Sequence, residues 1–501
     1  MINMPSVRLG IVAVSRDCFP AQLSIMRRRA VIAALGAKNT QIYEAQTVVE
    51  TENDAVKALL ELKEAGVNAL VLYLGNFGPE GPETYIVQQF GGPCMVVAAA
   101  EEGNLYDGRG DAYCGLLNCS YNLGLRGVKA YIPENPVGDA EEIACLIEEF
   151  CPIARAIIGV KGLKIFGFGP RPYDFLACNA PIKPFYDLGV TVMENSELDL
   201  FAAFNAHKGD SRISAVVEDM SRELGTGNRY SGVLPRLAQY ELTLLDFFEE
   251  NLGYCEYGVF ANKCWPAFQT EFGFVPCFVN ARLASRGIPV ACEVDLYGAL
   301  SEYIITLVTG RPATLLDINN TVPKAMIDPE AIKPYKPGDL FMGFHCGNTA
   351  SCLIRKPEMS YQRIMKSALE PDGEPDITRG TLEGALIAGD VTIFRLQGDA
   401  SGRLRAYAAE GEVLEMDPQS FGSIGVIAVP EMSRFYRHVL VADRYPHHAG
   451  IAFAHAGRSL FEVVKYLGVS DMSFNRPKEM LYTGENPFCV RATSGKEGDT
   501  V

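Results

Sequence analysis

Long hydrophobic runs are missing from this 501-residue sequence, in which no stretch reaches the roughly 18 to 20 consecutive apolar residues that span a bilayer. The N-terminal segment also lacks a charged region followed by an apolar core and a small-residue cleavage pattern, so we expect no signal peptide. These two absences favour a soluble, cytoplasmic protein without a membrane partner.

Basic residues are outnumbered, since 45 Lys and Arg face 61 Asp and Glu and give a formal net charge of -16. Nucleic-acid binding depends on clustered Lys and Arg that displace counterions from phosphates. The short basic run from Arg27 to Arg29 lies between apolar residues and is interpreted as one solvated face of a helix. The composition therefore predicts no nucleic-acid partner.

Closely spaced cysteine pairs are also absent, because none of the 14 cysteines forms a Cys-x-x-Cys motif. A chain of this length can bury enough surface to be stable without covalent cross-links. We therefore interpret most of the thiols as small buried side chains. No peptidase-like signature surrounds any of them, so a disulfide scaffold and a thiol peptidase are both disfavoured.

Alternating strand-like and helix-like segments predict the fold. Up to about residue 160, apolar runs such as Cys94–Ala99 alternate with amphipathic ones such as Thr51–Ala65, and a similar alternation begins at Leu163. Later, Ala385–Leu396 and Leu404–Leu414 flank a turn-rich segment and predict a β-hairpin. We predict an α/β protein with two Rossmann-like α/β domains, residues 1–160 and 161–312, followed by a mainly β C-terminal domain, residues 313–501.

One glycine-rich turn resembles a phosphate-binding loop without satisfying its chemistry. Gly167-Phe168-Gly169-Pro170-Arg171-Pro172 follows a predicted strand, where dinucleotide-binding turns occur. Its two prolines remove backbone N–H donors that a pyrophosphate would need. Dinucleotide binding is therefore disfavoured.

Two carboxylates follow apolar strand-like runs on either side of a helical segment. Glu293 ends the first run, residues 296–309 are helical in pattern, and Asp317 ends the second run. A strand-helix-strand crossover in one sheet makes the two strands parallel, so we expect both carboxylates at the same rim. Because two neighbouring acids repel, the pair is stable only if one is protonated or a cation lies between them.

Histidines are scarce, and two of the regions that contain some of the six lie among small residues. These regions are residues 343–349, with His345, and residues 445–450, with His447 and His448. Carboxylate oxygens suit Mg²⁺ or Mn²⁺, and an added imidazole favours Mn²⁺. Spacing alone leaves an alternative open, in which the acids cap helices or form ion pairs and the histidines are ordinary core or loop residues.

As a set, several motifs resemble the L-fucose/L-arabinose isomerase superfamily. They are, in chain order, Lys263-Cys264-Trp265-Pro266, Ala291-Cys292-Glu293-Val294-Asp295-Leu296-Tyr297-Gly298-Ala299, Asp317 and His345-Cys346-Gly347-Asn348. The resemblance implies a metal-dependent aldose-ketose isomerase that acts on a pentose or hexose through a cis-enediol. It also implies that Glu293, Asp317 and His448 hold Mn²⁺ or another divalent cation such as Mg²⁺ or Co²⁺, with Glu293 and Asp317 catalytic. Asp317, where arabinose isomerases use Glu, favours the fucose isomerase branch.

The same resemblance implies further site residues and a hexameric assembly. His345, Asn348 and Thr349 are expected beside the sugar, and His447 stands where the family has an Asn before the ligand histidine. Arg16, after the first strand, is a further candidate for sugar binding. So is Trp265, the single tryptophan of the chain, whose indole can pack against a sugar face.

Two alternatives stay open at this stage. The first keeps the chemistry and changes the substrate to a hexose with an anionic group at C6, such as a sulfo- or phospho-sugar, which Arg16 or another cation would pair. The second is a non-catalytic sugar-binding protein, because paired α/β lobes also bind sugars. The absent signal peptide and the additional β domain disfavour the second alternative.

Overall fold

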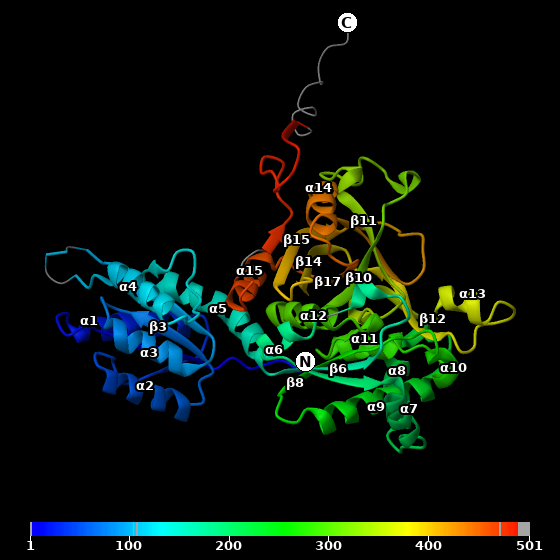
Figure 1. Ribbon diagram of the computed structural model, residues 1–501, viewed down its shortest axis with the longest axis horizontal. Helices are drawn as coiled ribbons and strands as arrows, with labels where there is room; N and C mark the ends of the chain where they lie inside the picture. Colours follow the sequence, from blue (N-terminus) through cyan, green and yellow to red (C-terminus); the bar gives the residue numbers. More distant parts are fainter. Residues whose placement is uncertain (1–2, 104, 107–108, 180, 470–471, 489–501) are drawn as a thin grey trace, which may run out of the picture. The chain divides into compact units, whose positions relative to one another are not determined.

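The computed structural model describes residues 3–103, 105–106, 109–179, 181–469 and 472–488. Its backbone forms three sheets, each built from its own region of the chain (Figure 1). The described residues group into two compact units, residues 5–159 with 462–467 and the remainder. Among the described helices, none combines the length and the apolarity needed to cross a membrane.

The first unit is built on a five-stranded parallel sheet in the order β2-β1-β3-β4-β5. Its strands are β1 (Leu9–Val14), β2 (Ile42–Glu44), β3 (Ala69–Leu74), β4 (Cys94–Ala99) and β5 (Val137–Gly138). Its helices are α1 (Ala21–Ala37), α2 (Glu52–Glu64), α3 (Glu80–Phe90), α4 (Ala112–Leu125) and α5 (Ala140–Lys161). Every residue of β1, β3 and β4 is buried, as expected for apolar strands covered by helices on both faces.

The second sheet is parallel and has the order β7-β6-β8-β9. Its strands are β6 (Leu163–Gly169), β7 (Thr191–Ser196), β8 (Tyr257–Ala261) and β9 (Val290–Ala291). The helices of this region are α6 (Lys183–Asp187), α7 (Glu197–Ala206), α8 (Ile213–Leu224), α9 (Leu234–Asn251), α10 (Phe268–Phe272), α11 (Cys277–Ser285) and α12 (Leu296–Thr309). Aromatic side chains from β6, β8, α9 and α10 form its core.

The third sheet is mixed and mainly antiparallel, in the order β12-β13-β16-β11-β10-β17-β14-β15-β18. Because β15 also pairs with β16, six of the nine strands close into a barrel. The strands are β10 (Thr314–Asn320), β11 (Leu340–His345), β12 (Ile354–Tyr361), β13 (Arg379–Leu386), β14 (Gly389–Gly398), β15 (Leu404–Val413), β16 (Ser423–Ala428), β17 (His448–Ala452) and β18 (Met472–Phe474). The accompanying helices are α13 (Arg363–Leu369), α14 (Met432–Phe435) and α15 (Gly457–Tyr466).

This architecture confirms the predicted fold class, two parallel α/β sheets followed by a β domain. It confirms the hairpin as β14 and β15, with β14 beginning at Gly389 because the preceding residues extend β13. Expecting β9 and β10 to be parallel neighbours in one sheet was wrong, since they belong to different sheets. The helix between them, α12, packs against β8 and β9 of one sheet and β14 and β17 of the other, which explains why nearly all of it is buried. The predicted domain boundaries at residues 160 and 312 stay predictions.

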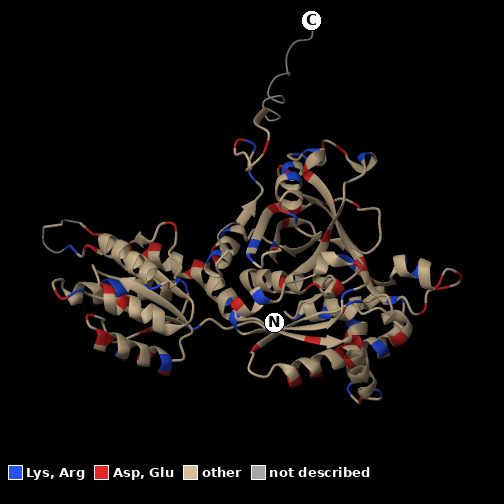
Figure 2. Cartoon of the chain, in the orientation of Figure 1, with Lys and Arg blue, Asp and Glu red and all other residues tan. Residues whose placement is uncertain are grey.

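Charged side chains are spread over many helices and loops of both units, with Lys and Arg interspersed among Asp and Glu (Figure 2).

Candidate metal centre and active site

Three side chains from distant parts of the chain converge between the second and third sheets. Glu293 lies in the single 3-10 turn that follows β9, Asp317 lies on β10, and His448 is the first residue of β17. The Nε2 atom of His448 is 2.9 Å from Oε2 of Glu293 and 3.4 Å from Oδ1 of Asp317. The two carboxylates therefore meet at one imidazole although their strands belong to different sheets.

Local backbone structure explains this convergence. Asp317 and His448 are directly opposite each other in the antiparallel pairing of β10 with β17, so their side chains share one face of the sheet. Glu293 and Val294 both adopt left-handed backbone conformations, with φ of 53° and 56°. This conformation is rare for a β-branched residue such as Val294 and indicates strain stored at the turn that carries Glu293.

The three facing atoms are buried and unpartnered. Oε2 of Glu293, Oδ1 of Asp317 and Nε2 of His448 have no hydrogen-bond partner, although each is shielded from water. Leaving buried polar atoms unsatisfied costs free energy, and a divalent cation bound by all three would remove that cost. Two carboxylate oxygens and one imidazole nitrogen are a donor set that Mn²⁺ accepts and that Mg²⁺ or Co²⁺ can share. His448 with either carboxylate and one further histidine forms a group whose ligand atoms lie within 4.8 Å of one another, so these residues fit a divalent metal ion.

Two more histidines surround this trio. Nε2 of His345 is 3.9 Å from Oε2 of Glu293, and Nε2 of His447 is 3.5 Å from Oδ1 of Asp317. Together with His448, each of these pairs forms a group whose ligand atoms lie close enough to share one ion. The site thus offers up to three imidazoles beside its two carboxylates.

The electrostatics of the trio favour the ionised acid. Burial works to raise the pKa of Glu293, but the adjacent His448 holds it below its ordinary value. Burial works to lower the pKa of His448, but hydrogen bonding to Asp295 and the neighbouring acids raise it above its ordinary value. Burial and the proximity of His448 lower the pKa of His447, which keeps that ring neutral. A proton and a cation would compete for the same nitrogen of His448.

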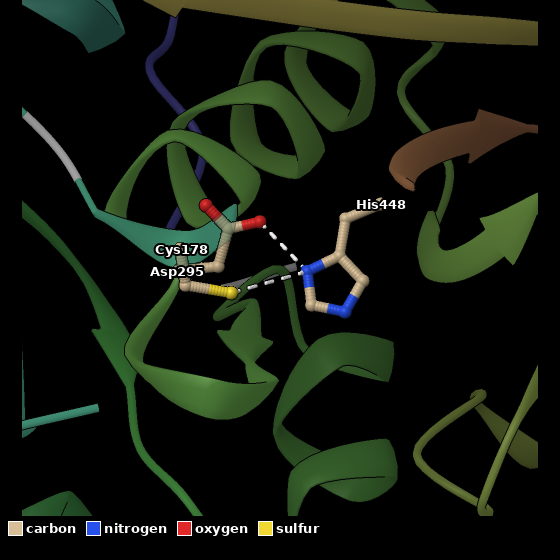
Figure 3. Close-up of side chains that lie close together, drawn as sticks. All are labelled: Cys178, Asp295 and His448. Carbon is tan, nitrogen blue, oxygen red and sulfur yellow. Dashed lines mark hydrogen bonds and ion pairs between the residues drawn. The ribbon is translucent and has the colours of Figure 1, made fainter. Parts of the chain in front are cut away.

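A second layer of side chains fixes the orientation of His448 (Figure 3). Its Nδ1–H donates to Oδ2 of Asp295 at 2.9 Å, and Sγ of Cys178 lies 3.8 Å from the same nitrogen. Arg395 donates to both carboxylate oxygens of Asp295, at 2.6 and 2.9 Å. Gln397 in turn accepts from Arg395 at 2.7 Å. Such a carboxylate-histidine arrangement sets the tautomer and the direction of a metal-binding imidazole.

Sequence reasoning missed Asp295 and Arg395 as functional residues. Asp295 stands two residues after Glu293 in the motif, and an acid that close to a ligand is a usable signal for an outer-layer partner. Arg395 is fully buried on β14, far away in sequence, and no pattern connects it to Asp295 before the fold is known.

The expected sugar-binding residues of the 345–349 segment differ in whether their polar atoms are already hydrogen-bonded. Nδ1 of His345 accepts from the backbone N–H of Cys346 at 2.9 Å, so its Nε2 faces Glu293. Oδ1 of Asn348 is buried without a partner, and its amide group approaches Cys292, next to Glu293. Thr349 is fully buried and its hydroxyl is hydrogen-bonded to Thr314 at 2.8 Å. His345 and Asn348 therefore have polar atoms left for a ligand, whereas Thr349 is already engaged.

An aromatic cluster adjoins the histidines. The Trp265 ring contacts Tyr173 and Phe175 edge to face, with centroids 6.1 and 6.2 Å apart. Phe175 also contacts His447 at 5.4 Å and His448 at 6.5 Å. Trp265 and His447 thus belong to one apolar wall beside the proposed ligands, a surface suited to the C–H faces of a sugar.

Arg16 belongs to the other compact unit. Its guanidinium lies 3.6 Å from Glu80 and 4.7 Å above the ring of Phe77, and its backbone N–H donates to Asn76. The structure therefore places Arg16 in an ion pair at the end of β1.

Comparison with known proteins adds independent information. Residues 10–161 match the family model for the fucose/sulfoquinovose isomerase N-terminal domain, and residues 343–473 match that for the L-fucose isomerase C-terminal domain. Relatives named sulfoquinovose isomerase include one from Alkalicoccus urumqiensis, 26% identical over 61% of this chain and 63% of the relative. Another, from Clostridium sp. (strain MSTE9), is 31% identical over 35% of this chain and 34% of the relative. A third, from Priestia aryabhattai, is 22% identical over 63% of this chain and 66% of the relative. Each match spans less than two thirds of the relative's length.

Proposed function

We propose that this chain, whose residues 10–161 and 343–473 match two family models of fucose isomerase domains, is a divalent-metal-dependent aldose-ketose isomerase. The observation that carries this proposal is that buried oxygens of Glu293 and Asp317, neither with a hydrogen-bond partner, both approach Nε2 of His448. We propose these three residues as the metal ligands, with Mn²⁺ as the preferred ion and Mg²⁺ or Co²⁺ as alternatives.

Isomerisation moves one hydrogen from C2 to C1 of the sugar and one between the two oxygens, with no net change in oxidation state. A bound divalent cation would polarise the sugar carbonyl and stabilise the negative charge that develops beside it. Glu293 and Asp317 supply the proton transfers, since a buried oxygen of each lies close to the same nitrogen of His448. One carboxylate takes the C2 proton, O1 gains a proton to give the cis-enediol, and return of a proton to C1 with loss of the O2 proton gives the ketose.

Other residues position the substrate. Asn348 and His345 have polar atoms left for the substrate, and Trp265, Phe175 and His447 form a wall that can pack against the C–H faces of the sugar. Asp295 holds the His448 ring so that Nε2 faces the two acids.

We propose a C6-sulfonated hexose as the substrate, because several relatives that match this chain are named sulfoquinovose isomerase. A neutral hexose or pentose is the competing substrate within the same chemistry. The expected hexamer and the cytoplasmic location stay predictions. The oligomeric state can be measured by light scattering of the purified protein.

A sugar panel tests the proposal. The protein is stripped with a chelator, dialysed, and assayed by NMR with sulfonated, phosphorylated and neutral aldoses, with and without added Mn²⁺. We expect interconversion of the sulfonated aldose and its ketose only after metal is restored. Metal-independent turnover would contradict the metal role, and absence of turnover with every sugar and metal would contradict the proposed function.

A further inference from the structure

A cavity of about 390 Å³ opens at the carboxyl ends of β6 and β7. Its lining residues are Gly167, Gly169, Pro170, Arg171, Cys178, Asn179, Glu194, Asn195, Ser196, Val294 and Leu296. Two of them connect it to the metal centre, since Val294 follows Glu293 in the chain and Cys178 approaches His448. The cavity therefore borders the proposed active site.

Arg171 is the cation of this cavity. Its Nε atom is buried and has no hydrogen-bond partner, and no ion pair of Arg171 exists among the described residues. A guanidinium group presents several N–H donors in a planar fork that matches the oxygens of a sulfonate, phosphate or carboxylate. An unsatisfied donor of this kind is costly unless a ligand accepts from it.

The other polar side chains of the lining are less available. The amide group of Asn195 donates to the carbonyls of Gly167 and Met193, and the Ser196 hydroxyl donates to Asp199 in a capping box. Glu194 is exposed and carries the charge that an anion avoids. Asn179 is exposed, so the guanidinium of Arg171 is the charged donor that the described lining offers to an anionic ligand.

Other cations near the proposed site already have partners. Lys263 forms an ion pair with Glu197 at 2.9 Å. Arg405, in a neighbouring cavity, also has a buried Nε without a hydrogen-bond partner, but its guanidinium stacks on Tyr445 and another of its nitrogens donates to a backbone carbonyl. Arg395 is saturated by an acid and a glutamine.

The position of Arg171 suits the far end of a sugar held at the ligands. Glu293 follows β9 and Arg171 follows β6, and β8 alone lies between these two strands. Two strand spacings correspond to about 10 Å. A hexose bound through O1 and O2 near Glu293 would therefore direct C6 across the end of β8 toward the cavity.

We infer that Arg171 is a specificity-determining residue that binds an anionic substituent at C6 of the sugar. This inference rests on the proposed isomerase function. It assigns a role to the Gly167–Pro172 turn, in which a side chain, rather than the backbone N–H groups that the prolines remove, recognises the anion.

The test compares kcat/KM for a C6-sulfonated aldose with that for the matching neutral aldose. Arg171→Met should lower the ratio of the two values by about 10- to 100-fold, the range expected for a hydrogen bond to a charged group. Arg171→Lys should lose less, because the charge stays and the planar fork is lost. Glu194→Gln should raise the ratio slightly.

Arg405→Met is the matched control, and it should not change the ratio. An unchanged ratio in Arg171→Met, or a fall in the control, would overturn the inference. Calorimetric titration of inorganic sulfate into metal-free wild type and Arg171→Met gives a readout without turnover, with weaker binding expected in the variant. Equal binding overturns the role of Arg171, whereas a wild type that binds sulfate through Arg171 but isomerises no sugar overturns the proposed function alone.

Discussion

Two groups of acids and histidines in this protein are spaced closely enough to hold a metal ion, but they differ in whether an arginine neutralises the acids. His207 and Asp210, which follow α7, lie close to Asp246 of α9, and Arg212 forms ion pairs with both acids. Both ring nitrogens of His207 are hydrogen-bonded, one to the Ala203 carbonyl and one to Asp246. Every charge in that group has an internal partner.

The group around Glu293, Asp317 and His448 has no arginine among its facing atoms: two carboxylates approach one histidine nitrogen, and none of the three atoms makes a well-formed hydrogen bond. Spacing alone therefore does not distinguish an ion-pair network from a metal site. What distinguishes them is whether the buried charges are satisfied by the protein itself.

The largest expected difference concerns catalysis. Glu293→Gln and Asp317→Asn should each lower kcat by about a thousand-fold or more, because each removes a proposed ligand and a proton-transfer group. Asp246→Asn, the matched change in the other group, should leave turnover at the wild-type level. Steady-state assays with circular dichroism as a folding control measure this, and near-wild-type turnover in either of the first two variants would rule out the assigned roles.

Metal should bind at the group around Asp317 and not at the group around Asp246. Adding Mn²⁺ to chelator-treated protein should raise the melting temperature, since a ligand that binds the folded state stabilises it. Asp317→Asn should greatly reduce this increase, whereas Asp246→Asn should retain it. Scanning calorimetry and metal analysis follow both effects, and an equal loss in the two variants would remove the distinction.

A smaller effect is expected from the layer behind His448. Asp295→Asn should weaken Mn²⁺ binding by about 10- to 100-fold, because an uncharged amide replaces the carboxylate that orients the imidazole and accepts from Arg395. Competition with a chelator of known affinity measures this change. Arg395→Met should act in the same direction through Asp295, and unchanged affinity in both variants would show that the pairing serves only the fold.

The smallest effect concerns pH and the His207 group. Burial opposes protonation of His207, but hydrogen bonds to Ala203 and Asp246 raise its pKa overall. A raised folded-state pKa stabilises the protein fully below the unfolded value near 6.5, and this contribution disappears as pH rises through the folded value. Asp246→Asn should therefore lower the free energy of unfolding more at pH 5.5 than at pH 9, with a difference of less than about 1 kcal/mol. Urea titrations at both pH values test the sign.

The fold class and the β14–β15 hairpin could be predicted from sequence because strand periodicity and turn residues are local signals. Glu293, Asp317 and His448 were selected by motif resemblance, and the structure brings them together. The chain connection differs from the predicted one, because α12 links a strand of one sheet to a strand of another instead of linking two strands of the same sheet. Periodicity reports that a strand exists but not which sheet it joins.

Other parts of the site depend on contacts between distant residues. The link from Arg395 to Asp295 joins β14 to the start of α12 and has no local signature. The sequence alone does not single out Arg171, because the Gly167–Pro172 turn is judged there by its backbone N–H donors and not by its side chains. Only the fold shows that its side chain lines a cavity next to Val294.

The pairing of Asp317 with His448 across β10 and β17 has a consequence for how such a protein can diversify. Strand register sets the separation of these two residues, so the long stretch of chain between them can lengthen, shorten or change its loops without altering it. A slip of either strand by one position would turn its own side chain to the opposite face of the sheet, away from the other. New sugar preferences can therefore evolve in the loops while the reaction centre is inherited intact.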